Sequence, residues 1–476
     1  MHTSTTDLRV IALETPTLGD RSYLVHDGSV ALVVDPQRDI DRVLALLEEH
    51  GVRLAAVFET HIHNDYVTGG LALAAATGAV YHVNADDPVR FERTPISDGD
   101  VVAVGDRMSV RALATPGHTY THLSYALYDA QRGDQRGDQR GDQRGDQRGG
   151  QAVAVFTGGS LLYGATGRPD LLGPDHTHDL VRLQHASAHR LADLLPDDTE
   201  VLPTHGFGSF CAATQSEATS STIGTERRVN PVLTQDLDQY VKELLDGLDV
   251  WPAYYVHMAP ANLEGPSAPD LSPPSPAHPS ELRRRIDAGE WVVDLRTRVA
   301  FAAGHVPGSF NFGLDGSFAT YLGWLIAWGT PLTLLAETPE EVAEGQRELV
   351  RIGIDRVEAA ATGTVEEWAP DGRATLQRAT FGDLAQVVHH RQVEILDVRR
   401  RLEWEDAHVI GARHIPLHEL PQRLDEIPQG EVWVHCGAGY RASIAASFLA
   451  AAGRQVVAVD DEFESAAPSG LPMSRG

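Results

Sequence analysis

Four histidines in the first half of the chain have the type and spacing of metal ligands. His61 and His63 stand two residues apart where the apolar, strand-like run RLAAVF at 53–58 ends, so both side chains should point the same way. His118 and His205 follow in separate loops, in the runs TPGHT and PTHGF. Imidazole is a common ligand of zinc and iron. We therefore expect these side chains to converge on one ion.

Near the other end of the chain, Cys436 stands between an apolar strand pattern, EVWV, and an apolar helix pattern, SIAASFLAAAG. In the loop HCGAGYRAS its thiol would face backbone N–H groups and a helix N-terminus, which favour a thiolate or persulfide anion. Arg441 adds a fixed positive charge. We expect Cys436 and Arg441 to be catalytic and Gly437 and Gly439 to line the substrate site.

The elements that position this cysteine occur twice. Each copy has a helical pattern, a short apolar strand that ends in Asp-x-Arg (Asp294 to Arg296, Asp397 to Arg399), and a turn that contains His. A duplicated α/β unit explains both. The later strand of the first copy reads LTLLAETPEE, with Ala336 at the position of the cysteine and two glutamates, Glu337 and Glu340, that would oppose an anion. We expect this copy to be catalytically silent.

Composition excludes several classes of partner and chemistry. The 67 acidic and 39 basic residues give a formal charge of −28, which repels nucleic acid and anionic membranes. One lysine, Lys242, leaves no residue for a phosphate-binding GKS loop. Two cysteines and a start without a signal pattern favour a reducing cytoplasm. The longest apolar stretch, at 321–336, is too short and too interrupted to span a membrane.

The length of 476 residues predicts about three domains. A Pro/Ser-rich segment at 264–280 reads as a linker between a domain at 1–263 and two units at 281–373 and 378–476. A QRGD repeat at 131–150 lies between two strand-like runs and predicts a flexible hairpin extension of the first domain. The expected fold class is a multidomain α/β protein.

The two later units resemble rhodanese domains, on VVDLR with GHVPGS and on ILDVR with HVIGARHIP. The first domain resembles the metallo-β-lactamase fold, an αββα sandwich, on THIHND, PGHT and PTHG. With GRPDL at 167–171, the whole pattern resembles the bacterial persulfide dioxygenase–rhodanese fusions. That resemblance implies oxidation of a low-molecular-weight persulfide to sulfite in the first domain. It also implies double-displacement sulfur transfer at Cys436, with sulfite or thiosulfate as partner.

Two positions depart from the family pattern. Tyr66 replaces the histidine of the second metal, and Gly159 replaces the aspartate of FTGD. In the hydrolytic relatives, the histidine and aspartate at these two positions build a dinuclear zinc site, together with the counterparts of Asp65 and His205. Their replacement disfavours a two-metal hydrolase. The resemblance implies one mononuclear metal held by His61 and His118, iron(II) being favoured and zinc possible. His63 or Asp65 remains open as a further ligand.

Two more residues are candidates for substrate binding. Arg168 has the charge to neutralise an anionic thiol carrier such as glutathione, and Cys211 lies close in sequence to His205 as a persulfide acceptor. Two alternative functions stay open: a glyoxalase II-like hydrolase of thioesters, and a sulfurtransferase whose first domain is a metal-free scaffold. We expect no nucleic-acid or membrane partner, and a homo-oligomer remains possible.

Overall fold

The computed structural model describes residues 8–133, 150–214 and 216–475. The chain forms two compact units. One contains residues 1–269 and 350–353, and the other contains residues 270–349 and 354–476. Residues 134–149 of the predicted QRGD hairpin lie outside the described residues. The strands on either side of them, β9 and β10, pair in antiparallel fashion.

Two six-stranded sheets form the centre of the first unit. One has the order β1 (Arg9–Thr15), β2 (Asp20–His26), β3 (Val30–Val34), β4 (Arg53–Phe58), β5 (Val80–Asn84), β6 (Thr94–Ile96). The other has the order β12 (Ser221–Thr222), β11 (Glu200–Pro203), β10 (Gly150–Gly158), β9 (Leu123–Gly133), β8 (Met108–Ala114), β7 (Val101–Val104). Side chains that alternate along the strands, among them Tyr23, Val25, Val110 and Ala112, fill the space between the sheets.

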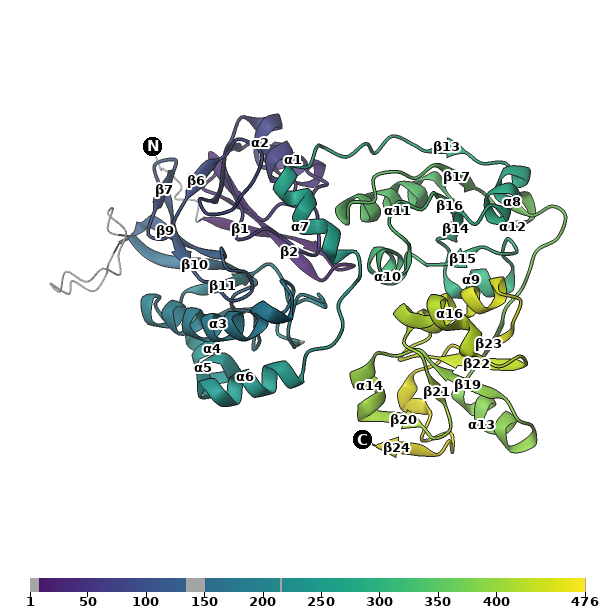
Figure 1. Cartoon of the computed structure of the whole chain (residues 1–476). Helices are drawn as coiled ribbons and strands as arrows, with labels where there is room; N and C mark the ends of the chain where they lie inside the picture. The colour runs from purple at the N-terminus through teal and green to yellow at the C-terminus, as the bar shows by residue number, and fades with distance from the viewer. Residues whose placement is uncertain (1–7, 134–149, 215, 476) are drawn as a thin grey trace. The chain divides into compact units, whose positions relative to one another are not determined.

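Helices cover both outer faces of this sandwich (Figure 1). The first sheet packs on α1 (Asp41–His50) and α2 (Gly70–Thr77), and the second packs on α3 (Pro174–Leu194) and α6 (Leu237–Asp246). The shorter α4 (Ile223–Val229) and α5 (Pro231–Thr234) lie beside α3, and α7 (Tyr255–Glu264) ends the domain. The αββα architecture predicted from the sequence is confirmed.

The second unit contains two parallel five-stranded sheets with the same strand order. The first is β13 (Ser275–Pro276), β17 (Ala359–Thr362), β16 (Leu332–Ala336), β14 (Trp291–Asp294), β15 (Phe310–Asn311). The second is β18 (Gln377–Ala379), β23 (Gln455–Val459), β22 (Glu431–His435), β19 (Glu394–Asp397), β21 (Arg413–His414). Shared topology agrees with the duplication inferred from the sequence, and the two α/β units follow the sandwich as expected.

Helices connect the strands of each copy. The first copy has α8 (Pro279–Asp287), α9 (Arg298–Ala303), α10 (Phe318–Leu325), α11 (Pro339–Arg351) and α12 (Val365–Trp368). The second has α13 (Phe381–His390), α14 (Arg401–Asp406), α15 (Leu420–Arg423) and α16 (Tyr440–Ala451), and a small sheet of β20 (Ala407–Val409) and β24 (Met473–Arg475). Short 3-10 turns lie at Leu417–Glu419, Leu424–Glu426 and Phe463–Ser465.

The repeated Asp-x-Arg motif is a buried ion pair at the end of a strand. Arg296 donates to the Asp294 carboxylate at 2.6 Å and to the Gly304 carbonyl at 2.8 Å. Arg399 makes the same pair with Asp397, at 2.7 Å, and reaches the Ala407 carbonyl at 2.7 Å. Each arginine ties the strand to the loop that follows. The motif therefore marks the fold of both copies.

The Pro/Ser-rich segment is more ordered at its end than the linker interpretation implied. Ser275 and Pro276 form β13 at the edge of a sheet, where a proline without an N–H is tolerated, and Ala277 is buried. The apolar stretch at 321–336 supplies part of α10 and all of β16. Among the described residues, no helix is long and apolar enough to cross a membrane.

Candidate functional site

The four predicted histidines lie together at one edge of the sandwich. His61 and His63 follow β4, His118 lies in the loop between β8 and β9, and His205 follows β11. All four side chains are buried, none more than 1% exposed. The chain ends of β4, β8 and β11 bring residues together that are far apart in sequence. The four histidines therefore lie close together, but His63 does not share a group of potential ligands with His61 and His118.

The first group contains His61, His118 and His205, whose ligand atoms all lie within 4.8 Å of one another. The Nε2 atoms of His61 and His205 are 3.4 Å apart. The Nε2 atom of His118 has no hydrogen-bond partner among the described residues. Burial and the neighbouring histidines lower the pKa of His61, and burial lowers the pKa of His118 to about 3. Both are therefore neutral imidazoles at neutral pH.

Each of these three rings is anchored through its other nitrogen. His118 Nδ1 donates to the Arg168 carbonyl at 2.8 Å. His61 Nδ1 lies 2.9 Å from Thr60 Oγ1, whose hydroxyl donates in turn to Asp35 at 2.7 Å. His205 Nδ1 lies 2.9 Å from Asp20 Oδ1. Carbonyl, hydroxyl and carboxylate partners of this kind fix the tautomer and orientation of metal-binding histidines.

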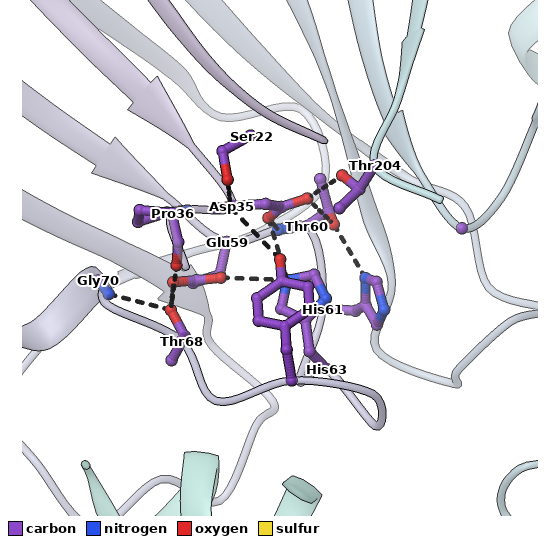
Figure 2. Close-up of polar contacts among 12 residues, drawn as sticks. Ser22, Asp35, Pro36, Glu59, Thr60, His61, His63, Thr68, Gly70 and Thr204 are labelled. Atoms are coloured by element: carbon purple, nitrogen blue, oxygen red, sulfur yellow. Dashed lines mark hydrogen bonds and ion pairs between the residues drawn. The ribbon is translucent and has the colours of Figure 1, made fainter. Parts of the chain in front are cut away.

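His63 belongs to a different set of contacts, drawn in Figure 2. Its Nε2 lies 3.0 Å from Tyr66 Oη, 3.3 Å from Glu59 and 3.4 Å from Asp35. Burial opposes a charge on this ring, but the two carboxylates raise the pKa of His63 to about 9. His63 also lies within 4.8 Å of Asp65 and His205 in a second group of potential ligands. His63 and His61 do not share a group.

Asp65 and Asp20 surround the far side of the His205 ring. Asp65 Oδ2 lies 3.1 Å from His205 Nδ1. Although burial opposes it, these two carboxylates raise the pKa of His205 well above its usual range. Burial and the Asp65 charge together raise the pKa of Asp20 to about 7. Asp65 and Asp20 thus favour positive charge on His205, and they would equally favour a metal cation bound at Nε2.

Gly159 has no side chain at a point where His118 leaves no room for one. A Cβ atom there would overlap the His118 ring, at 2.6 Å from Cγ. The Gly159 N–H donates to Nε2 of His122 at 3.1 Å, and His122 Nδ1 meets Thr115 Oγ1 at 2.9 Å. Both nitrogens of His122 are therefore engaged, which separates it from the neighbouring His118 as a potential ligand.

Four acidic and hydroxyl residues that support the histidines were not predicted from the sequence. Asp20, Asp35, Glu59 and Thr60 are all buried. Asp35 is the one non-glycine residue with positive φ, 51°, in the part of the chain that the structure describes. Strained backbone of this kind concentrates at functional sites. The sequence carries no local signal for Asp20, because its partner His205 is 185 residues away.

The donor set fits a divalent metal. Three buried imidazoles face one another. The Nε2 atoms of His61 and His205 share one hydrogen bond, the Nε2 atom of His118 has no partner among the described residues, and all three Nδ1 atoms are partnered. Uncompensated buried lone pairs are costly unless a cation or a donor meets them. Zinc and iron both accept such ligands.

Arg168 is buried and its donors are already engaged. Nε and Nη2 each lie 2.7 Å from a carboxylate oxygen of Asp170, and Nη1 lies 3.4 Å from the Phe210 carbonyl. Its backbone carbonyl accepts from His118, so Arg168 helps to position that ring. Its role in neutralising a thiol carrier stays a prediction.

Cys211 is fully buried and lies near the same carboxylates. Burial, together with Asp65 and Asp20, raises the pKa of its thiol well above the usual range. A reactive cysteine needs the opposite environment, one that stabilises the thiolate. Its role as a persulfide acceptor stays a prediction that this environment does not favour.

Cys436 directly follows β22, and α16 starts four residues later. Gly439 holds the loop with a φ of 86°, and a Cβ there would overlap Asp460 Oδ1. Arg441 lies in the first turn of α16 and donates both guanidinium arms to Glu403, at 2.6 and 2.7 Å. The strand, the loop and the helix thus follow one another in the order that the sequence predicted, and the catalytic roles of Cys436 and Arg441 stay predictions.

A small pocket opens beside this loop, between the two copies of the second unit. It is lined by Tyr321, Trp324 and Leu325 of the first copy and by Val398, Arg400, Leu417, His418 and Arg441 of the second. The second copy contributes Arg441, which lies in the first turn of the helix that follows the cysteine loop. The first copy contributes α10, with aromatic side chains. An aromatic and basic wall suits an organic anion.

In the equivalent loop of the first copy, a glutamate side chain binds the backbone N–H groups. Glu341 Oε2 accepts hydrogen bonds from the backbone N–H groups of Glu337, at 2.8 Å, and Thr338, at 3.0 Å. Ala336 ends β16 at the position of the cysteine. A carboxylate therefore occupies the N–H groups that could otherwise hold an anion. The sequence singled out Glu337 and Glu340, whereas Glu341 makes these contacts.

Comparison with known proteins gives matches for both parts of the chain. The Rhodanese-like domain family matches residues 278–350 and 380–466. A hydroxyacylglutathione hydrolase of Synechococcus sp. (strain JA-3-3Ab) is 32% identical over 247 residues, which cover 47% of this chain and 88% of that protein. The persulfide dioxygenase ETHE1 of Homo sapiens, a mitochondrial protein, is 27% identical over 249 residues, covering 52% of this chain and 81% of the relative.

Other hydroxyacylglutathione hydrolases match over about half of their own length. Among solved structures, a metallo-β-lactamase from Staphylococcus aureus subsp. aureus COL superposes with a TM-score of 0.64 at 23% identity. The match covers 75% of this chain and 100% of the other. This likeness supports the fold.

Proposed function

The chain belongs to the metallo-β-lactamase-fold proteins that carry rhodanese-like domains, and on this premise we propose that it oxidises a low-molecular-weight persulfide and transfers sulfane sulfur. The observation that carries the oxidative half is the convergence of three buried imidazoles with room for one metal. The relatives named as persulfide dioxygenases supply the substrate class.

In the first half-reaction, R–S–SH, O2 and water give R–SH, sulfite and two protons. The outer sulfur is oxidised, O2 is reduced, and the S–S bond breaks. A bound iron(II) would supply oxygen activation. The chain's own part is to hold that ion through neutral histidines, because neutral ligands leave its positive charge available to an anionic persulfide. The buried walls around His61 and His118 exclude bulk water.

In the second half-reaction, Cys436 exchanges sulfane sulfur with sulfite. The Cys436 thiolate attacks the outer sulfur of a persulfide and displaces R–S⁻, which leaves Cys436 as a persulfide. Sulfite then attacks that outer sulfur, forms thiosulfate and releases the thiolate. The loop N–H groups and Arg441 stabilise the anion in both forms. The sulfite made in one half-reaction is thus a substrate of the other.

Cys436→Ser tests this division of labour. Because serine provides no sulfane-sulfur carrier, the variant should form no thiosulfate from persulfide and oxygen, and sulfite should accumulate in its place. Oxygen uptake should stay near the wild-type rate. Product analysis of sulfite and thiosulfate in parallel with oxygen consumption gives the result. Thiosulfate formation that survives the substitution would assign sulfur transfer to another residue.

A thioester hydrolase is the second candidate, because the Synechococcus relative is named a hydroxyacylglutathione hydrolase. Tyr66 and Gly159 count against it, since they replace ligands that a two-metal site requires, and the Tyr66 hydroxyl is engaged by His63. Two zinc ions per chain together with hydrolysis of an acylated glutathione would favour this candidate over persulfide oxidation.

A further inference from the structure

We propose that the metal of the first domain is held by exactly three protein ligands, the Nε2 atoms of His61, His118 and His205, with no carboxylate bound to it. Tyr66 and Gly159 are the substitutions that make this set possible. The assignment deepens the function proposed above and rests on its premise that the domain binds a metal. It does not depend on which reaction the metal serves.

The first argument is the spacing of the nitrogens. His61 Nδ1 lies against Thr60 Oγ1 and His205 Nδ1 lies against Asp20 Oδ1, which leaves the two Nε2 atoms facing each other in a hydrogen bond of 3.4 Å. A metal bound by both nitrogens would replace the proton that they share. Two ligands in a tetrahedral site with metal–nitrogen bonds of about 2.0–2.1 Å are separated by about 3.3–3.4 Å. The spacing therefore suits a tetrahedral ion.

The second argument is the way the three rings are held. The Arg168 carbonyl, the Thr60 hydroxyl and the Asp20 carboxylate each accept from one Nδ1–H group. The Thr60 hydroxyl can accept from His61 because its own proton goes to Asp35. In all three rings, which come from three loops, Nδ1 faces an acceptor and Nε2 is the nitrogen turned towards the other rings. That is the arrangement expected of metal-binding histidines and their supporting partners.

The third argument concerns His63, whose nitrogens lie elsewhere: Nε2 faces Tyr66, Glu59 and Asp35, and Nδ1 has no hydrogen-bond partner among the described residues. His63 does not belong to the group of His61, His118 and His205, whose ligand atoms lie within 4.8 Å of one another. Tyr66 stacks on the His63 ring, with centroids 4.3 Å apart. The competing ligand group of His63, Asp65 and His205 includes the Asp65 carboxylate, which lies 3.1 Å from His205 Nδ1. Asp65 therefore lies beside Nδ1 of His205, on the side of the ring opposite the nitrogen offered to the metal.

The fourth argument concerns Gly159. A side chain at this position would overlap the ring of His118, so the ring and a carboxylate cannot both occupy the space. Gly159 is consequently required for the observed position of His118. Three neutral ligands leave the full charge of a divalent ion, and the remaining position suits an anionic sulfur ligand such as a thiolate or persulfide.

Metal analysis of the full-length protein tests the ligand set. Wild-type protein loaded with iron(II), zinc(II) or cobalt(II) and then desalted should retain about one ion per chain. His205→Gln should lower retention by about tenfold or more, and the matched variant His63→Gln should retain the wild-type amount. Gly159→Asp should also lose metal because it displaces His118. Circular dichroism of each variant verifies folding.

X-ray absorption of the wild-type zinc or cobalt protein provides a measurement that needs no variant. Three imidazoles in the coordination sphere agree with the proposal, whereas two or four overturn it. Retention abolished by His63→Gln, retention raised by Gly159→Asp, or a wild type that binds none of the three ions also overturns it. Three imidazoles without oxygen uptake on persulfide would leave the ligand set standing and refute the proposed function.

Discussion

Carboxylates are placed differently in the two candidate sites. In the first domain, carboxylates stand one step behind the histidines: Asp20 behind His205, and Asp35 behind Thr60 and His61. In the last domain, a carboxylate binds an arginine directly, because Glu403 accepts both arms of Arg441, the residue predicted to be catalytic. A bidentate pair fixes the guanidinium plane next to the loop of Cys436. The two sites thus differ in what their carboxylates contact: histidines and a threonine in the first domain, and an arginine in the last.

The Arg441–Glu403 pair predicts a pH dependence of stability. Burial opposes the charge, but Arg441 lowers the pKa of Glu403 from 4.5 to about 2. A lowered folded-state pKa stabilises the protein above pH 4.5, and this stabilisation disappears as the pH falls towards 2. Glu403→Gln should thus reduce the free energy of unfolding at pH 7 by on the order of 1 to 3 kcal/mol.

Urea unfolding of wild type and Glu403→Gln at pH 7, 4 and 3 measures this difference. The gap between the two proteins should shrink as the pH falls. Glu464→Gln, at an exposed position, is the control and should behave as wild type at each pH. A gap that stays constant from pH 7 to pH 3 would show that the pair does not carry this linkage.

The loops that follow equivalent strands differ between the two copies of the second unit. The strands β16 and β22 occupy the same place in their sheets, and each is followed by a helix. After β22 the loop turns through Gly439, whose φ is 86°. After β16 the loop binds the Glu341 carboxylate. The same fold thus carries two different loops at this position.

Gly439→Ala should disable the cysteine loop. Its φ of 86° disfavours any side chain, and a Cβ would overlap Asp460. We expect the loop to shift and sulfur transfer to cyanide to fall by roughly 100-fold, the effect of misplacing a reactive group by about 1 Å. Gly382→Ala, in the first turn of α13, is the control and should keep full activity. Wild-type transfer by Gly439→Ala would contradict this account of the loop.

Element-scale patterns were the part that the sequence predicted well. Apolar periodicity located β4, β22 and α16, and the local runs located His61, His118, His205 and Cys436. Grouping of the histidines was not predictable, because it depends on contacts such as those of His205 with Asp20 and of His63 with Glu59, which form only in the tertiary fold. The same holds for Glu341. β13 was missed because its residues read as a linker.

At the scale of the whole molecule, the second unit is held together across its two copies. Phe448 of α16 stacks on Phe310 with ring centroids 4.3 Å apart and meets Trp291 edge-on at 5.4 Å. Asn311 accepts from Ser443 at 2.7 Å and its N–H donates to Ser447 at 3.1 Å. These contacts lie on the helix that begins at the cysteine loop. The first copy therefore packs directly against the helix that follows the cysteine loop of the second.

Phe448→Ala tests this packing. Removal of a buried aromatic ring from between the copies should lower the free energy of unfolding of the second unit by about 3 kcal/mol and reduce sulfur transfer. Denaturant unfolding and a transfer assay measure the two effects. Val299→Ala, at a half-exposed position on α9, should change neither. A loss below about 1 kcal/mol would mean that the copies are stable independently.

Oxygen consumption tests the central claim most directly. Full-length protein reconstituted with iron(II), supplied with glutathione persulfide under air, should consume two molecules of persulfide for each O2, one oxidised to sulfite and one used to convert that sulfite to thiosulfate, and protein stripped of metal should turn over neither. Added iron(II) should restore the activity of the stripped protein. The account would be contradicted by iron-loaded protein that takes up no oxygen with persulfide yet hydrolyses an acylated glutathione.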